Sequence, residues 1–280
     1  MPTRKILNSH RAPVIYTLAQ VQFTPILKMA QFMPDIQEAL RQTLPLLEEK
    51  QEVSIRFAIS KEGPPQPQPT QTTSWQFLSL DRRTALYLRN NNFVFHSTAY
   101  KDFEDFFARM QELLAAVQNV VNIGVVVRYG LRYVDVFQTD EGGFPSRHFI
   151  PSLQGLSGTE LGRVGGLQGV DGLNAKAEQR VNETIYSTAF GTMTVRMIES
   201  VGAVTLAPDL SATSVVVPNF PEPDPQKQFI SLDIDHFKDG VTETFSMEAT
   251  ETAIRNLHIG TSAAFFAMLV EEYIDALVGQ

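Results

Sequence analysis

The chain has 280 residues, and its 43% hydrophobic and 19% charged content is typical of a folded globular protein rather than a disordered one. A formal net charge of -8, with 23 Lys and Arg residues and no basic run, argues against nucleic-acid binding and against a polybasic membrane anchor. The chain has no cysteine, which excludes disulfides and thiolate metal sites, and no apolar signal segment before Pro13, so we expect a cytoplasmic protein.

The first predicted elements are a strand, a helical stretch and a second strand. Val14–Phe23 is rich in β-forming residues and partly alternates, which indicates a strand that ends before Pro25. Ile26–Leu47 has helical periodicity interrupted by prolines, and Val53–Ile59 alternates like a strand. Gly63–Thr73 is rich in Pro, Gln and Thr and has no apolar side chains to bury. It therefore predicts a solvated hairpin loop, with a proline-rich ligand motif as the less common alternative.

Three short strands and an amphipathic helix follow. The strands are predicted at Trp75–Leu80, Thr84–Arg89 and Asn92–Ser97, with turn residues between them. In Lys101–Val117, apolar residues recur at three- and four-residue steps and acidic residues fill the first turn, as in an amphipathic helix. The apolar residues of this helix are Phe103, Phe106, Phe107, Met110, Leu113, Leu114 and Val117. Such a row predicts packing in a core against a sheet rather than a cofactor pocket.

The long strand predicted at Val125–Phe137 contains three candidate ligand-binding residues. Alternation places Arg128 and Arg132 on one face and Asp135 on the other, among Tyr and Leu residues. The two guanidinium groups could bind a carboxylate or phosphate, although cross-strand pairing with acids is the more common arrangement. A buried carboxylate needs a partner, so a structural hydrogen bond, for example to an arginine, is the expected role of Asp135. A catalytic acid is the alternative role.

A glycine-rich stretch divides the chain. Gly142–Gly172 contains nine glycines but neither a GxGxxG pattern nor a Gly-Lys-Ser/Thr ending, so phosphate binding is only weakly indicated. We therefore predict an N-terminal α+β half over residues 1–140, a glycine-rich connection or lid over 141–175, and a C-terminal α+β half over 176–280. One continuous domain is the alternative.

The second half contains further strands and then helices. Strand-like segments are Thr184–Ser200, Ala203–Ala207, Ser214–Val217 and Phe229–Phe237, and the proline-rich connection is Pro218–Gln228. Two helices are predicted, Glu248–Leu257 and Ala263–Val278, with His258 at the end of the first. Because the strands come in consecutive groups, the fold class is predicted as α+β, with predominantly antiparallel sheets and long amphipathic helices packed on one face. The two halves share this coarse order.

Signatures of catalysis and of metal binding are weak throughout. Asp233, Asp235 and His236 form the most metal-like cluster, but a strand would send His236 to the opposite face. An Asp-rich turn at a strand end is the preferred interpretation, and no metal or cofactor is predicted. No HExxH or Gly-x-Ser-x-Gly motif occurs. His96 and Asp135 are the acid–base candidates, although we lean against enzymatic activity.

Several short segments together resemble a sporadically distributed family of uncharacterised bacterial proteins. They are Ala12–Val14, Phe23–Pro25, Arg128–Tyr133, Leu232–Asp235 and Leu257–His258. The family has no assigned activity, so the resemblance implies a single full-length unit in a bacterial cytoplasm and nothing catalytic. Its patchy distribution suggests mobile genes, such as those of toxin–antitoxin or phage-defence systems.

Two functions follow as hypotheses. The first is a non-enzymatic protein-binding or accessory module, whose partner is another protein or a second copy of the chain. The second is a small-molecule-binding protein or enzyme that recognises an anionic ligand between sheet and helix. In that case Arg128 and Arg132 would bind the anion, and Asp135 or His96 would act as acid or base.

Overall fold

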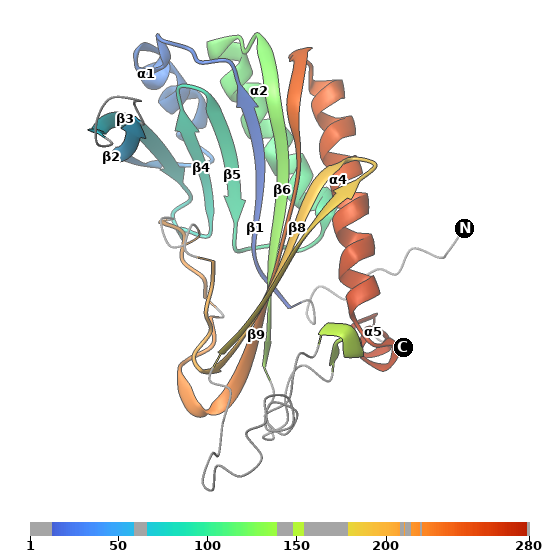
Figure 1. Cartoon of the computed structure of the whole chain (residues 1–280). Helices are drawn as coiled ribbons and strands as arrows, with labels where there is room; N and C mark the ends of the chain where they lie inside the picture. Colours follow the sequence, from blue (N-terminus) through green and yellow to red (C-terminus); the bar gives the residue numbers. More distant parts are fainter. Residues whose placement is uncertain are drawn as a thin grey trace, which may run out of the picture.

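A computed structural model describes residues 13–58, 66–138, 148–153, 179–207, 210, 214–218 and 220–278. The protein has an α+β fold built on one nine-stranded sheet, in which every pair of neighbouring strands is antiparallel (Figure 1). The strands are β1 Val14–Phe23, β2 Leu46–Ala58, β3 Gln66–Leu78, β4 Thr84–Arg89, β5 Asn92–Ser97, β6 Val125–Gln138, β7 Gln179–Thr188, β8 Gly191–Gly202 and β9 Asp224–Thr244.

The strand order is β2-β3-β4-β5-β1-β6-β9-β8-β7. The first strand therefore lies in the middle of the sheet, paired with β5 on one side and β6 on the other. Strands β2 to β5 form a meander on the β5 side, and β6, β9, β8 and β7 extend the sheet on the other side. Strands from before and after the glycine-rich stretch thus belong to one sheet, whereas the similarity of two halves stays a prediction.

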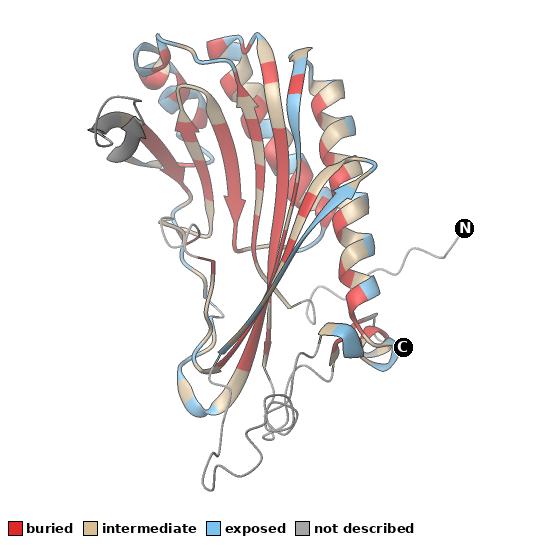
Figure 2. Ribbon diagram, viewed as in Figure 1, coloured by how far each residue is buried: buried red, intermediate tan, exposed pale blue. Residues whose placement is uncertain are grey.

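The helices pack on the sheet around one main core. They are α1 Met29–Leu40, α2 Phe103–Val121, α4 Met247–Met268 and α5 Glu271–Val278, with a short 3-10 turn η2 at Pro151–Leu153. Residues of α1, α2 and α4 share a buried cluster with residues of β1, β5 and β6. The central strands are accordingly the most buried part of the sheet (Figure 2). None of the described helices is long and apolar enough to cross a membrane.

The predicted apolar face of α2 is confirmed as core. All seven residues named for it are buried, and the ring of Phe106 lies 5.0 Å from that of Phe95 in β5. The side chain of Asp102 accepts a hydrogen bond from the Asp105 amide at 2.8 Å and so caps the helix. The helix ends at Asn122, which has the left-handed conformation common after a helix.

The predicted loop at Gly63–Thr73 is wrong for most of its length. From Gln66 onward the backbone is strand β3, which pairs with β2 along thirteen residues. Strand β4 reaches only Trp75–Leu78 of β3, so the earlier part of β3 lies beyond the end of β4. Prolines two residues apart are tolerated there because they direct their missing N–H groups to the same side of the strand. Residues 63–65 lie outside the described residues.

Two predictions in the C-terminal part also need correction. Asp233, Asp235 and His236 are not in a turn but in the middle of β9, a strand of 21 residues. His258 is not at a helix end, because α4 continues through it from Met247 to Met268. Gly260 lies in the gap that was predicted between two helices, and the structure shows that it packs closely: a Cβ atom there would lie 2.5 Å from Cε1 of His236. The glycine allows the helix to approach β9.

Other boundaries moved by a few residues. The region Ile26–Leu47 is helical only as α1, and β2 begins at Leu46 rather than at Val53. Thr184–Ser200 is a hairpin of two strands, β7 and β8. The connection predicted at Pro218–Gln228 already becomes part of β9 at Asp224. Apart from residues 148–153, the glycine-rich connection or lid lies outside the described residues.

Candidate functional site

The four predicted site residues do not form one site. Tyr133 contacts His258 of α4, so alternating residues of β6, including Asp135, face the helices. Arg128, Arg132 and, through strand pairing, His96 lie on the opposite face of the sheet. An acid–base role for Asp135 toward a ligand bound by the two arginines is therefore not supported by this arrangement.

Arg132 is the start of a row of charges that crosses four strands. Its Nε and Nη2 atoms donate to the two carboxylate oxygens of Asp233 on β9, at 2.7 and 2.6 Å. Arg196 of β8 also donates to Asp233, at 3.1 Å, and to Glu183 of β7, at 2.6 Å. Arg132 and Asp233 are almost completely buried. The cross-strand pairing expected from the sequence is thus present and links the centre of the sheet to β7, but the Arg132–Asp233 pair is buried rather than on a solvated face.

Arg128 is paired separately. Its Nη1 donates to Asp239 at 2.6 Å and its Nε donates to Gln20 at 3.2 Å, while the guanidinium lies 3.8 Å from the ring centre of Phe237. Four residues along a strand span about 13 Å, so Arg128 and Arg132 are too far apart to grip one small anion together. An anion at either arginine would have to displace a carboxylate.

His96 lies beneath the segment that follows β8. Its ring is hydrogen-bonded to the Tyr16 hydroxyl, and Tyr16 packs with Ala207 and Leu210 in a small cluster on this face of the sheet. Burial lowers the pKa of His96 to about 4. The imidazole is therefore neutral at neutral pH and is not poised as a general acid.

Asp135 is a buried carboxyl group with one oxygen left without a hydrogen bond among the described residues. It is 1% exposed, and its Oδ1 atom has no hydrogen-bond partner within the described residues. It faces a cavity of about 60 Å³ between β6 and α4, beside Tyr100, Tyr133 and His258. Burial raises the pKa of Asp135 to about 8, and the charge of Asp233 contributes to this rise. The expected structural partner, such as an arginine, is not found among the described residues.

The titration of Asp135 predicts a pH-dependent stability. Between about pH 4 and pH 8 the folded protein retains a proton on Asp135 that the unfolded chain has released. The free energy of unfolding should therefore fall as pH rises through this window, by about 1.4 kcal/mol per pH unit from this group. Asp135→Asn should remove this contribution. The free energy of unfolding of the variant should therefore fall less between pH 4.5 and pH 7.5 than that of the parent, as measured by urea unfolding at both pH values.

The control for this prediction is Glu222→Gln, which alters an exposed carboxylate. It should leave the slope unchanged. Equal pH dependence of unfolding in the parent and in Asp135→Asn would show that Asp135 is not protonated in the folded protein.

Alternation along β9 separates the residues of the Asp233, Asp235 and His236 cluster. Asp233 faces Arg132, whereas His236 lies under α4, with its Nδ1 3.0 Å from the Leu257 carbonyl oxygen and its Nε2 2.9 Å from the Thr188 hydroxyl. Within the parts of the chain that the structure describes, no three His, Asp or Glu side chains are grouped so that they could bind a metal.

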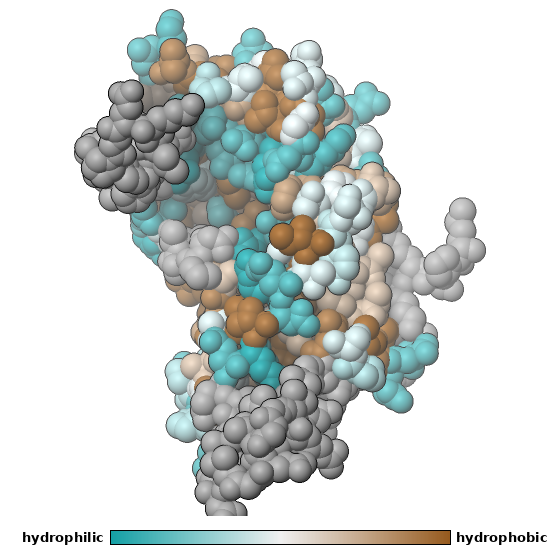
Figure 3. All heavy atoms as spheres, viewed as in Figure 1, coloured by the Kyte–Doolittle hydropathy of each residue, from teal (hydrophilic) through white to brown (hydrophobic). Residues whose placement is uncertain are grey.

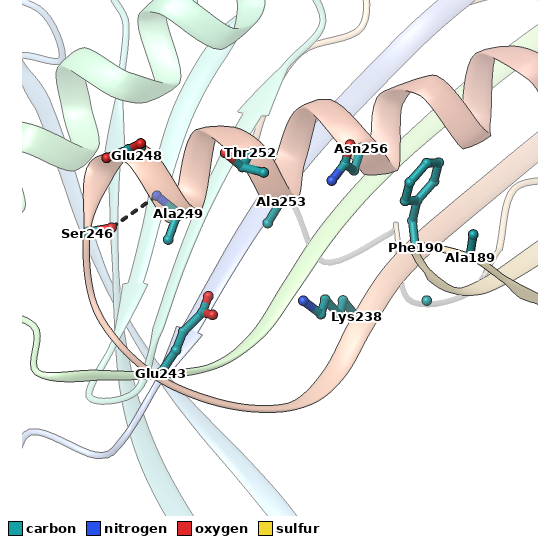
Figure 4. A pocket seen from close by; sticks show the side chains of 11 residues that line it. Ala189, Phe190, Lys238, Glu243, Ser246, Glu248, Ala249, Thr252, Ala253 and Asn256 are labelled. Carbon is teal, nitrogen blue, oxygen red and sulfur yellow. Dashed lines mark hydrogen bonds between the residues drawn. The ribbon is translucent and has the colours of Figure 1, made fainter.

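A polar groove lies beside the first half of α4 (Figure 4). Its volume is about 560 Å³, and it is bounded by the β7–β8 turn, the end of β9 and the helix. Lys238 and Glu243 project from β9 toward the helix, where Glu248 adds a second carboxylate and Ser246 caps the helix through the Ala249 amide. This mixture of charges favours no single class of ligand.

Strand β7 forms one edge of the sheet, and it is exposed. Among the described strands it pairs only with β8. Val181 is 60% exposed, Ile185 65% and Tyr186 45%, and most of the strand is pale blue in Figure 2. The other edge, β2, has charged residues at Glu48–Lys50, which discourage pairing with another strand. Strand β7 therefore offers an exposed edge, on which Arg180 and Glu183 are the charged residues.

A groove runs between this edge and the second half of α4. It has a volume of about 320 Å³ and is mostly apolar. Its lining residues include Tyr186, Met193, Val195, Met197 and Met268. Alternation places Val181 and Ile185 on the other side of β7, with Glu183. Both sides of the edge strand thus present apolar side chains, and Figure 3 shows hydrophobic residues scattered among hydrophilic ones on the face in view.

The sequence did not single out β7 or its groove. The only signal was the β-forming content of Thr184–Ser200, and an edge position depends on the order of strands rather than on local residues. No protein-family model matches the chain, and a search of curated proteins finds no match.

Proposed function

We propose that this protein is a non-enzymatic binding module that accepts an extended segment of a protein partner as an additional strand beside β7. The observation that supports it is the exposed edge of β7, a row of backbone groups suited to pairing with another strand. The apolar groove beside it would take alternate side chains of the partner. From the resemblance to a patchily distributed bacterial family we also propose that the protein is an accessory or antitoxin-like subunit in the cytoplasm.

The chemistry of the edge defines the partner segment. Side chains of an added strand would meet Val181 and Ile185 on one side and Tyr186 and Met193 on the other. A segment with β-branched or aromatic residues on both faces, and few charges, would bury the most apolar area there. We therefore propose an apolar, uncharged strand of a different protein as the occupant.

The test uses peptides selected by display against the whole protein. Those that bind should be apolar and extended, and they should slow hydrogen exchange at amides of β7. The double variant Val181→Lys with Ile185→Lys should weaken binding about tenfold or more, because charges on the edge oppose strand addition. Leu27→Lys and Leu80→Lys are matched controls, since these leucines are 93% and 78% exposed elsewhere. The controls should bind as the parent does.

Two results would contradict the proposal. One is peptide binding that protects amides elsewhere and is unaffected by the lysines on β7. The other is concentration-dependent self-association, measured by sedimentation, that the double variant abolishes. In that second case the edge would pair with a second copy of the chain.

A further inference from the structure

The cavity at Asp135 is separate from the groove at β7, although both border α4. Ten residues line it, and five of them have aromatic or imidazole rings: Tyr100, Tyr133, His258, Phe265 and Phe266. Its volume of about 60 Å³ has room for at least one water-sized group. The cavity is thus a small aromatic enclosure with one carboxyl group in its wall.

The Asp135 carboxyl has no cationic partner among the described residues. No Arg or Lys of the described residues forms an ion pair with it, and Oδ1 is buried without a hydrogen bond. The neighbouring polar groups are hydrogen-bonded to each other. The Tyr133 hydroxyl lies 3.2 Å from Nδ1 of His258 and is hydrogen-bonded to Tyr100. The His258 ring also stacks on Phe103 at 3.8 Å. An unpaired buried carboxyl is costly, and a bound donor would remove that cost.

We propose that this cavity binds the ammonium group of a small primary amine, with ionised Asp135 as the counter-ion and the aromatic rings as walls. A carboxylate satisfies the charge and accepts an N–H hydrogen bond, and ring faces attract cations. The need for an N–H donor at Oδ1, together with the small volume, favours a primary over a quaternary amine.

The ligand has a way in and a place for its carbon chain. Three of the lining residues, Val14, Tyr100 and Phe266, are only partly buried, and the proposed ligand would enter beside them. An ammonium group inside would leave its alkyl chain against these side chains. The inference is independent of strand addition at β7, because the cavity is not lined by any residue of β7 or β8.

Binding must be linked to deprotonation of Asp135. Burial raises the pKa of this carboxyl to about 8, whereas an alkylamine, like lysine, stays protonated well above that value. An amine that binds protonated Asp135 therefore displaces one proton to solvent, whereas binding to the ionised carboxylate releases none. The affinity should fall about 25-fold between pH 8.5 and pH 6.5, as the ionised fraction of Asp135 falls.

The experiment titrates the whole protein with n-propylammonium by calorimetry, with n-propanol and propionate as neutral and anionic controls. We expect millimolar binding of the amine alone at pH 8.5, the predicted loss at pH 6.5, and a change in the carboxyl carbon-13 resonance of Asp135. Asp135→Asn should abolish binding, while Asp239→Asn, which alters a carboxylate on the opposite face, should retain it.

Ser262→Phe provides a second variant that keeps Asp135 but narrows the cavity, and it should also abolish binding. Circular dichroism checks that each variant is folded. The inference is overturned if the amine does not bind at pH 8.5, if Asp135→Asn or Ser262→Phe still binds it, or if n-propanol binds equally well. Lysines introduced on β7 should leave amine binding unchanged, so the two proposals fail separately.

Discussion

Replacing Phe106 or Phe107 by alanine is expected to lower the free energy of unfolding by about 3–5 kcal/mol. Both side chains are almost fully buried, and Phe106 packs against Phe95 of the central strand β5. Truncation removes apolar contacts and leaves a cavity that rigid neighbours fill only in part. Since a domain is typically stable by about 5–15 kcal/mol, soluble expression itself could be lost. Chemical denaturation of the purified variants measures the change.

The matched control lies on the same helix. Glu112→Ala alters an exposed position of α2 and should change the free energy of unfolding by less than about 0.5 kcal/mol. If both phenylalanine variants were as stable as the parent, the packing of α2 on the sheet would not be the core of this protein.

Replacing Asp233 by alanine is expected to cost about 3–5 kcal/mol, because it leaves the buried guanidinium of Arg132 without its two-point carboxylate partner. Arg196 loses a contact as well, so the row of charges toward β7 is broken at its centre. The measurement is urea unfolding at neutral pH. Asp239→Ala is the control, because the Arg128–Asp239 pair is more exposed and should contribute only about 0–1 kcal/mol.

A double variant separates charge from packing. Arg132→Met with Asp233→Leu replaces the pair by apolar side chains and should recover most of the loss caused by Asp233→Ala. Failure to recover would mean that the pair positions the strands through more than its own charges. Equal effects of Asp233→Ala and Asp239→Ala would contradict the burial of the Arg132–Asp233 pair.

Local sequence predicted the elements whose residues agree with one regular period. Strands β1, β4 and β5 have the predicted bounds, and α2 was recognised from its apolar spacing and acidic first turn. In these segments the local pattern and the final packing favour the same conformation, so the spacing of the apolar residues was enough to predict the element. The side of β6 on which Asp135 lies was predicted from the same alternation.

Predictions failed where a distant segment decides the conformation. The proline-rich start of β3 has the composition of a loop, but it forms a ladder with β2. Gly260 weakens a helix locally, but α4 continues past it because the missing side chain lets the helix pack on His236. The Asp-rich segment of β9 favours a turn by itself, yet Arg132 and Arg196 neutralise its Asp233 within the sheet.

The sequence by itself determined the class of the protein, its antiparallel strands, the buried face of α2 and the unusual position of Asp135, since all of these depend on composition and on the period of neighbouring residues. Only the tertiary structure decided which strand lies at an edge, which carboxylates find arginines and which one faces a cavity. Those properties depend on pairs of residues far apart in the chain: β7 is exposed because of the strand order, and Asp135 faces a cavity because residues of α4 form the opposite wall. Local periodicity contains no information about such partners.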